Sequence, residues 1–167
     1  MNLGTTYIKS RRSVRKYKDT PVPEEAVRDA LECARLAPTA RNAQAWLFGV
    51  VKEPEKLAAI AEMTTHGKFI KDAKVCFFVF CERDHDYFIE DGCAATTQMA
   101  LALMANGVYS CWVAGNQKEY AEEIRKYLNV PEKYALIALL PAGFPEEMTI
   151  PKKKTLDEVV FYETFSE

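Results

Sequence analysis

Lys74–Cys81 reads KVCFFVFC, a continuous apolar run that is rich in residues favoured in strands. A strand with one wet face would alternate apolar and polar residues, and this run does not alternate. It therefore predicts a strand that is buried on both faces. Such a strand requires cover on each side, which favours a central sheet between two layers of helices.

The segments on either side of this run also show the periodicity of regular structure. Upstream, Pro23 and the two glutamates after it begin a helix that Pro38 ends, because proline suits a first helical turn and disfavours helix in the residue before it. The apolar spacing then predicts a strand at Trp46–Val51 and a helix at Pro54–Met63. Downstream we expect a helix at Glu90–Asn106, a strand at Tyr109–Val113, a helix at Lys118–Leu128 and a strand at Tyr134–Ala142.

Two segments suggest contacts beyond a single chain. Met99–Ala105 of the long helix is apolar all round, and in a chain of this size a subunit interface is one way to bury it. The tail Glu158–Phe165 (EVVFYETF) has strand propensity but little chain left to cover it. It could pair with a sheet edge of a neighbouring subunit.

Helices and strands interleave along the chain, but several connections are too short for right-handed parallel crossovers. We therefore expect an α+β fold of three layers, in which helices flank a central mixed sheet. The 167 residues correspond to one domain, spanning 1–167, because no linker or internal repeat divides them.

Composition narrows the classes of function. A formal net charge of -2 favours neither nucleic acid nor an acidic membrane as partner. The apolar stretches are too short to span a bilayer and the N-terminus has no apolar signal core, so we expect a cytoplasmic protein. The five cysteines form no CxxC pair and lie mostly in apolar runs, which disfavours disulfides and metal clusters. No GxSxG, Walker or GxGxxG motif supports a serine hydrolase or a Rossmann site.

Positive charge is concentrated in Lys9–Tyr17 (KSRRSVRKY). Arginine presents a planar fork that meets two phosphate oxygens at once, and Arg11, Ser13 and Arg15 share one face of an extended segment. A phosphate grip is one interpretation of the run. A solvated basic arm is the other, and composition alone favours the arm.

Four further motifs allow either a site or an ordinary structural role. The loop Ala37–Trp46 (APTARNAQAW) offers amides and hydroxyls that suit the edge of a heteroaromatic ring, or that cap a turn. Cys111–Gly115 (CWVAG) lets backbone N–H groups approach a ligand, or simply ends a strand. Pro151–Lys154 (PKKK) is a second phosphate contact or solvated surface. Asp84–Asp91 (DHDYFIED) is interpreted as an exposed acidic loop and helix cap rather than a metal site.

The order of these motifs resembles that of the FMN-dependent nitroreductase family, over roughly Ile8 to Val160. The shared pattern is a basic segment, then PTARNAQAW after the first long helix, then a helix ending NGVYSCWVAG, then a Lys/Arg cluster before LDEVV. The resemblance implies an interlocked homodimer of the nitroreductase-like fold, with two FMN sites at its interface.

The resemblance also implies roles for particular residues. FMN phosphate and ribityl groups would be bound by Arg11, Arg12, Ser13 and Arg15, with further phosphate contacts from Lys152, Lys153 and Lys154. The other subunit would line the flavin with Pro38, Thr39, Ala40, Asn42 and Gln44. The backbone of Val113, Ala114 and Gly115 would pass beside the ring, with an N–H near Ala114 facing flavin N5. No catalytic side chain is assigned, and no metal is expected.

Three positions depart from the family's pattern. Thr39-Ala40 replaces the usual Ser-Ser, Gln44-Ala45-Trp46 replaces Gln-Pro-Trp, and Ala114 stands where some members carry an acid. A backbone donor does not depend on that acidic side chain, so FMN binding is still expected. Substrate preference stays open, because the chain is short and lacks much of the cover that longer members place over the site.

The implied activity is transfer of two electrons from NADH or NADPH, through bound FMN, to a small acceptor such as a nitroaromatic or a quinone. Three alternatives remain at this stage. One is an FMN carrier or sensor without reductase activity, and another is a flavin dehydrogenase or dehalogenase on the same fold. The last is a nucleic-acid-binding protein with a basic arm.

Overall fold

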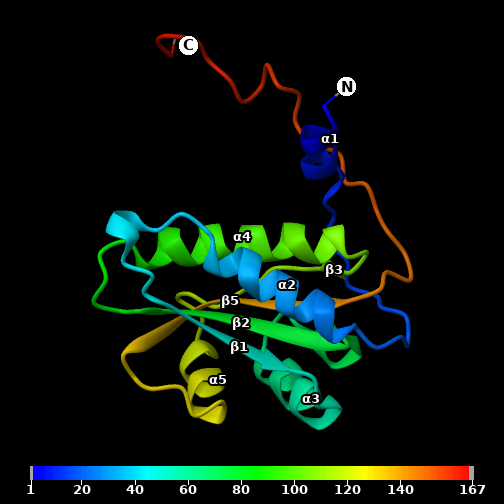
Figure 1. Ribbon diagram of the computed structural model, residues 1–167, viewed down its shortest axis with the longest axis vertical. Coiled ribbons are helices and arrows are strands. Elements are labelled where there is room, and N and C mark those ends of the chain that lie inside the picture. The colour runs from blue at the N-terminus through cyan, green and yellow to red at the C-terminus, as the bar shows by residue number, and fades with distance from the viewer. Residues whose placement is uncertain (1, 166–167) are drawn as a thin grey trace.

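The computed structural model describes residues 2–165 and places a sheet between two layers of helices (Figure 1). The strands run in the order β1 (Trp46–Val51), β2 (Val75–Glu82), β5 (Tyr134–Gly143) and β3 (Tyr109–Ser110), and β4 (Val113–Ala114) also pairs with β5. Every named ladder is antiparallel, and parallel pairing in residues 2–165 is limited to a bridge between Ser13 and Ser110. The expected three-layer α+β fold is confirmed, but the sheet expected to be mixed is antiparallel in all of its named ladders.

Helices cover both faces of this sheet. One layer contains α2 (Glu24–Arg35) and α4 (Phe88–Ala105), and the other contains α3 (Pro54–Met63), the short η2 (Lys68–Asp72) and α5 (Ala121–Tyr127). The predicted helix at Pro54–Met63 and strand at Trp46–Val51 have these same bounds in the structure. Among residues 2–165, no helix is long and apolar enough to cross a membrane.

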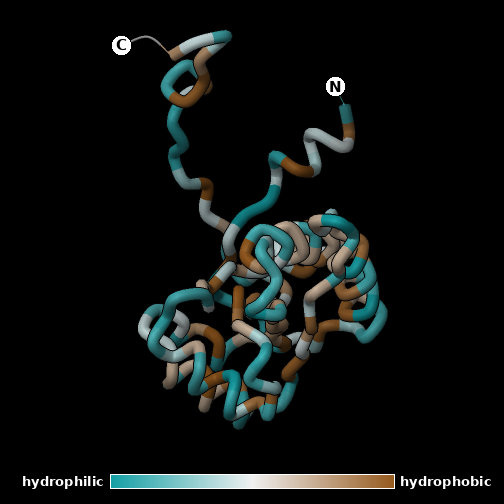
Figure 2. The backbone as a smooth tube through the Cα atoms, turned by 90° about the vertical axis from the view of Figure 1, so that its left-hand side faces the viewer, coloured by the Kyte–Doolittle hydropathy of each residue, from teal (hydrophilic) through white to brown (hydrophobic). Residues whose placement is uncertain are grey.

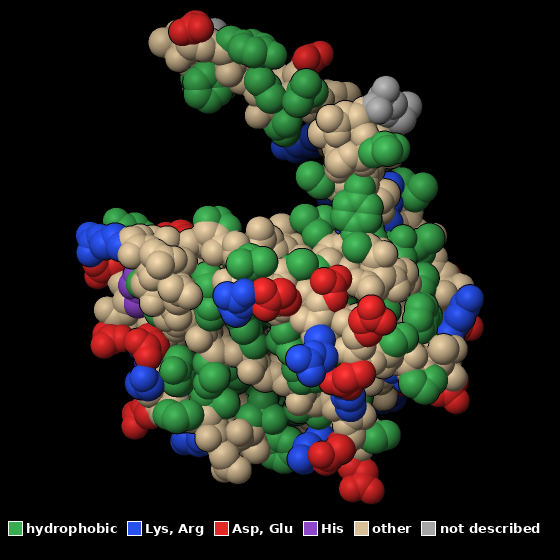
Figure 3. All heavy atoms as spheres, in the orientation of Figure 1, with side chains coloured by type: hydrophobic (Ala, Val, Ile, Leu, Met, Phe, Trp, Pro, Cys, Tyr) green, Lys and Arg blue, Asp and Glu red, His purple; other side chains and the backbone are tan. Residues whose placement is uncertain are grey.

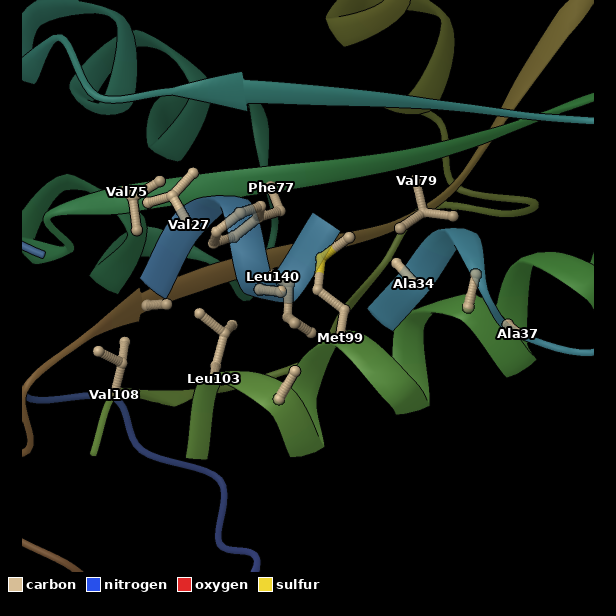
Figure 4. Close-up of a cluster of buried hydrophobic side chains, with 14 of the residues drawn as sticks. Val27, Ala34, Ala37, Val75, Phe77, Val79, Met99, Leu103, Val108 and Leu140 are labelled. Atoms are coloured by element: carbon tan, nitrogen blue, oxygen red, sulfur yellow. The ribbon is translucent and has the colours of Figure 1, made fainter. Parts of the chain in front are cut away.

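The run KVCFFVFC forms β2, which is buried at every position except its last. Successive side chains point to opposite faces, so Phe77 and Val79 pack in the cluster under α2 and α4. Phe78 and Phe80 pack in the cluster under α3 and α5. Figure 4 shows the first of these clusters, with Met99 and Leu103 of α4 reaching toward the sheet. Each such side chain contributes about 1.5–3 kcal/mol of burial free energy.

The strand expected at Tyr109–Val113 is divided in two, and Pro141 explains the break. Cys111 donates its N–H to the Pro141 carbonyl (3.2 Å), but proline has no N–H to return the bond. The register continues on both sides, from Ser110 opposite Ala142 to Val113 opposite Leu139. The gap therefore reflects a missing donor rather than a slip of the strand.

Two terminal segments leave the body on the same side (Figures 1 and 2). The first is α1 (Leu3–Ser10), which the sequence patterns did not predict and which has no buried residue. The second is the chain from Glu146 to Phe165, which is exposed throughout. The tail 158–165 forms no strand, because it extends away from the sheet and a strand needs a neighbour to complete its hydrogen bonds. Hydrophobic side chains gather on these projecting arms in the space-filling view (Figure 3).

Candidate functional site

The basic run is fixed to the body by two buried residues, Val14 and Tyr17. Val14 is buried and donates its N–H to the carbonyl of Ser110 in β3 (3.1 Å). Tyr17 is buried as well, and its hydroxyl donates to the carbonyls of Val14 (2.7 Å) and Pro141 (3.0 Å). Burial raises the pKa of Tyr17 well above its ordinary value, so it acts as a neutral donor. The anchored backbone leaves the side chains of Arg11 and Arg15 exposed.

A cleft of about 590 Å³ lies between this run and the C-terminal arm. Its volume is in the range of small-molecule sites. Every charged side chain that lines it is cationic, and none of its lining residues is acidic. The lining consists of Ile8, Lys9, Arg11, Arg12, Ser13, Arg15, Thr149, Ile150, Pro151 and Lys153. This composition favours an anionic group.

The late lysines do not contribute equally to the cleft. Lys153 lines it, whereas Lys152 and Lys154 are exposed side chains that do not belong to the lining. An extended segment alternates its side chains, so one lysine of three consecutive ones faces the basic run. The structure therefore selects Lys153 from the predicted cluster.

Two arginines of the run are held in different ways. The Arg12 guanidinium donates to the carbonyls of Lys9 and Arg11, both at 2.8 Å, and so closes the end of α1. The Arg15 guanidinium lies over the ring of Phe69, with 5.9 Å from its central carbon to the ring centroid. Arg12 thus stabilises the backbone conformation of the run, and the guanidinium of Arg15 is held in place over the ring of Phe69.

A second cavity of about 250 Å³ continues from the run toward the sheet. Arg11 and Ser13 line both spaces, and Trp112 and Thr97 line the inner one. The Arg11 guanidinium lies 3.5 Å from the Ser13 hydroxyl, a long contact that leaves most of its donors available. The two residues therefore stand where a ligand's charged end and its body would meet.

The strand end places Ala114 and Gly115 in different environments. Gly115 is buried, donates its N–H to the carbonyl of Ile137 (2.9 Å), and would place a Cβ 2.6 Å from Leu136. Its small size therefore serves packing against β5 rather than approach to a ligand. Because ladder bonds alternate, the backbone of Ala114 faces away from β5, and its carbonyl accepts the hydroxyl of Tyr120. No sequence motif pointed to Tyr120.

The loop Pro38–Gln44 has an unusual backbone and a buried anchor. Arg41, Asn42 and Gln44 all have left-handed φ angles, of 55°, 55° and 53°. The Thr39 hydroxyl and the Ala40 N–H both donate to the carboxylate of Asp91, the fourth residue of α4. The sequence interpreted Asp84–Asp91 as an exposed acidic loop and helix cap; Asp91 does lie at the beginning of the expected helix, but it is only 4% exposed and its carboxylate binds the loop.

The loop and the basic run of one chain do not form a common site. The run contacts α4 from Thr97 to Met104, whereas the loop is tied to Asp91 at the beginning of the same helix (Figure 1). At 1.5 Å per helical residue these contacts lie about 9–20 Å apart. No cavity described within residues 2–165 is lined by both segments.

The fold, together with this cationic cleft, defines an oxidoreductase with the nitroreductase architecture. The chain belongs to the Nitroreductase family, whose sequence model matches residues 8–67 and 61–144. The family expected from the order of the motifs is therefore confirmed.

Individual proteins show the same relationship. A protein of Methanothermobacter thermautotrophicus, provisionally named NADH dehydrogenase/NAD(P)H nitroreductase, is 34% identical over 145 residues, covering 84% of this chain and 76% of the relative. The structure of an FMN-dependent nitroreductase from Clostridium difficile R20291 matches with a TM-score of 0.90 and 29% identity, covering 95% and 98% of the two chains. A provisionally named nitroreductase from Desulfovibrio desulfuricans, solved in complex with FMN, matches with a TM-score of 0.86 and 27% identity over 99% of each chain.

Proposed function

We propose that this protein is an NAD(P)H-dependent flavoenzyme that binds FMN with its phosphate in the cationic cleft. The observation that carries the proposal is the convergence of Arg11, Arg15 and Lys153 on one cleft with no acidic lining residue. A phosphate monoester needs charge and directional donors, and arginine supplies both. Structural relatives whose titles name FMN support this choice of anion.

The remaining predicted residues are assigned around that phosphate. Arg12 holds the run in shape, Ser13 lines the cleft beside Arg11, and Lys152 is expected to act through long-range charge only. The backbone of Ala114 is available to the flavin ring, whereas Val113 and Gly115 fix that peptide against β5. Tyr120 orients the same peptide through its carbonyl.

When bound, the flavin supplies the chemistry of accepting a hydride and passing two electrons to a small acceptor. The protein's own part is binding and electrostatics. Arg11 and Arg15 place positive charge at the cleft, and preorganised charge of this kind stabilises an anion without reorganisation during reaction. No catalytic side chain is required by this scheme. A nitroaromatic or a quinone is the proposed class of acceptor.

A homodimer completes the proposed site. The loop Pro38–Gln44 and the basic run lie toward opposite ends of α4 and share none of the described cavities, and we propose that the loop that meets each flavin comes from a second copy. The outer face of α4 agrees with this arrangement. It carries a shallow apolar depression that includes Leu36 and Leu101, and the buried Gln98 Oε1 has no hydrogen-bond partner within residues 2–165.

The arms and the sheet edge support the same assembly. The bridge from Ser13 covers β3, whereas the outer edge of β1 is open beside an apolar groove of about 190 Å³. The tail 158–165 has strand-forming residues and exposed aromatic side chains. We propose that the tail of one subunit covers the β1 edge of the other, as β-strand addition would.

The decisive test is the visible spectrum of the purified protein, followed by anaerobic addition of NADH or NADPH. We expect a yellow protein that releases FMN, and whose flavin absorbance is bleached by at least one nicotinamide. A yellow protein that neither nicotinamide bleaches would indicate an FMN carrier instead. A colourless protein that cannot be loaded with FMN would overturn the proposal, and salt-sensitive nucleic-acid binding would then be tested.

The phosphate assignment has its own test in Arg11→Ala. This change removes one charge-assisted contact, and we expect FMN affinity to fall about 10- to 100-fold while FMN-saturated activity changes little. Equilibrium titration of flavin fluorescence measures the affinity. Lys18→Ala, a neutralised exposed residue outside the cleft, is the matched control. Unchanged affinity in Arg11→Ala would show that the phosphate lies elsewhere.

A further inference from the structure

Asp91 and His85 form a buried pair behind the loop Pro38–Gln44. His85 Nε2 lies 2.9 Å from Asp91 Oδ2, and the two side chains are 16% and 6% exposed. The same carboxylate accepts the Thr39 hydroxyl at Oδ2 (2.5 Å) and the Ala40 N–H at Oδ1 (3.0 Å). Thr39 and Ala40 both donate to this carboxylate, and the His85 ring nitrogen can donate to it as well in the tautomer that carries a proton on Nε2, so the site suits an ionised carboxylate.

The carboxylate is directed at the loop rather than at its own helix. Asp91 lies in the first turn of α4, where an acidic residue ordinarily stabilises the exposed N–H groups of the helix. Its side-chain bonds instead go to Thr39 and Ala40, more than fifty positions earlier in the sequence. Gly92 fixes the placement, because a Cβ there would lie 2.7 Å from Ile137. The beginning of α4 is thus pressed against β5 with Asp91 facing the loop.

The Thr39 hydroxyl extends this anchor along the loop. It donates to Asp91 and at the same time accepts the N–H of Gln44 (3.1 Å). A hydroxyl can do both, since it has one proton and two lone pairs. The contact closes a ring of backbone from Thr39 to Gln44, which contains the left-handed residues Arg41 and Asn42. The side-chain amide of Gln44 also donates to the backbone carbonyl of Asn42 (3.3 Å) within the ring.

Left-handed backbone at residues other than glycine is costly, by about 1–2 kcal/mol each. A loop with three such residues, all exposed, does not gain this conformation from its own packing. Fixed contacts elsewhere must hold it. Within the loop, short-range bonds link Asn42 to Thr39, Ala43 to Ala40 and Gln44 to Asn42, and the two bonds to Asp91 tie this unit to the body of the protein.

We propose that Asp91, supported by His85 and extended by Thr39, is a positioning residue that holds the loop Arg41–Gln44 in the conformation that contacts the flavin of the partner subunit. Asp91 itself does not touch the cofactor in this scheme. The inference rests on the proposed function for the identity of the ligand. The anchoring of the loop is a property of the chain alone, so the two are tested separately.

The anchor is tested without cofactor by hydrogen exchange in the full-length, flavin-free protein. The isosteric Thr39→Val removes the hydroxyl. Asp91→Asn replaces one accepting oxygen with an NH₂ group, which cannot accept the bonds that the carboxylate accepts. We expect exchange at the amides of Ala40 and Gln44 to accelerate at least tenfold in both variants, while exchange in β2 stays slow. Thr39→Ser keeps the hydroxyl and should restore protection. Protection unchanged in both variants would overturn the proposal.

Thr96→Val is the matched control for loss of a buried hydroxyl. Thr96 lies on the same helix and is fully buried, and within residues 2–165 its hydroxyl bonds only to the carbonyl of Gly92 (2.7 Å). It contacts neither the loop nor the cationic cleft, so its removal should leave the exchange of Ala40 and Gln44 unchanged. If Thr96→Val accelerated exchange at Ala40 and Gln44 as much as Thr39→Val does, the effect would be general destabilisation of the protein. That result would overturn the proposal.

The functional consequence is measured on protein titrated with FMN. We expect Asp91→Asn and Thr39→Val to weaken FMN binding about 10- to 100-fold, and to change the visible circular dichroism of the flavin even at saturation. Thr39→Ser should restore the wild-type spectrum. Wild-type protein that binds no FMN would end the proposed function while the exchange result still stands. A wild-type spectrum and affinity in both variants would show that the loop does not meet the flavin.

Discussion

The two segments proposed to meet at the flavin are attached to the body by opposite means. The basic run is held by apolar burial of Val14 and by neutral bonds from Tyr17, spread over several residues. The loop Pro38–Gln44 is held by one carboxylate, that of Asp91. The first attachment is distributed and insensitive to pH. The second is concentrated in a single charge, so its loss should be abrupt and local.

The largest effect is expected where the distributed attachment is broken. Val14→Asp places an unpaired charge at a position that is 2% exposed, and it should reduce the free energy of unfolding by about 3–5 kcal/mol. Urea denaturation followed by circular dichroism measures the change. Lys18→Asp, an exposed substitution in the same segment, should change stability by about 0.5 kcal/mol or less. Equal stability of the two variants would mean that Val14 is not a structural anchor.

A smaller effect is expected when the concentrated attachment is titrated. Burial raises the pKa of Asp91, but the bonds from Thr39, Ala40 and His85 outweigh it and hold that pKa below the ordinary value. The folded state therefore gains stability that is complete above about pH 3.9, the unfolded value, and that is lost as the pH falls through the lower folded pKa.

The measurement for this titration is urea stability of wild type and Asp91→Asn between pH 6 and pH 3. The wild type should be more stable at pH 6, and the difference between the two proteins should shrink as the pH falls below about 4. The asparagine variant lacks the titrating group and serves as its own reference. A difference that stayed constant with pH would contradict an ionised anchor.

The smallest effect separates the two neighbouring lysines of the arm. Lys153 lines the cleft and Lys152 does not, so Lys153→Ala should weaken FMN binding about 2- to 5-fold, as an exposed charge would, and Lys152→Ala should weaken it less. Both variants have the same net charge, which makes each the control for the other. Because salt screens charges, the FMN affinities of the two variants should become more similar as the salt concentration is raised. A larger loss in Lys152→Ala would reverse the assignment.

Much of the fold follows from local pattern. KVCFFVFC identifies the central strand because its composition alone requires cover on both faces, and the helix at Pro54–Met63 is bounded by its own proline and apolar spacing. The division of Tyr109–Val113 escaped prediction because its cause, Pro141, lies on another strand. Helix α1 escaped it because the basic run after it dominates the pattern.

The candidate site was also predictable only in part, because some of its residues depend on contacts between segments that are far apart in the sequence. The arginines and lysines indicate affinity for an anion, and the order of the motifs, rather than the basic run alone, suggested a phosphate site. Asp91 and Tyr120 act through burial and through bonds to backbone, and neither property is visible before the chain is folded. The choice of Lys153 over Lys152 depends on the direction in which one exposed segment alternates. Short-range pattern thus predicts the chemistry of the site, and tertiary contacts decide its exact membership.

Pro141 leaves a seam in the sheet, a missing ladder bond beside the inner cavity. Cys111 and Trp112 lie between β3 and β4, whose pairing with β5 is fixed, but they do not themselves form a complete set of strand hydrogen bonds. Trp112 also lines the inner cavity. We therefore expect substitutions of Trp112 to change the inner cavity more than they change the register of the strands on either side. A fold with such a seam can change the molecules it accepts while its scaffold stays the same.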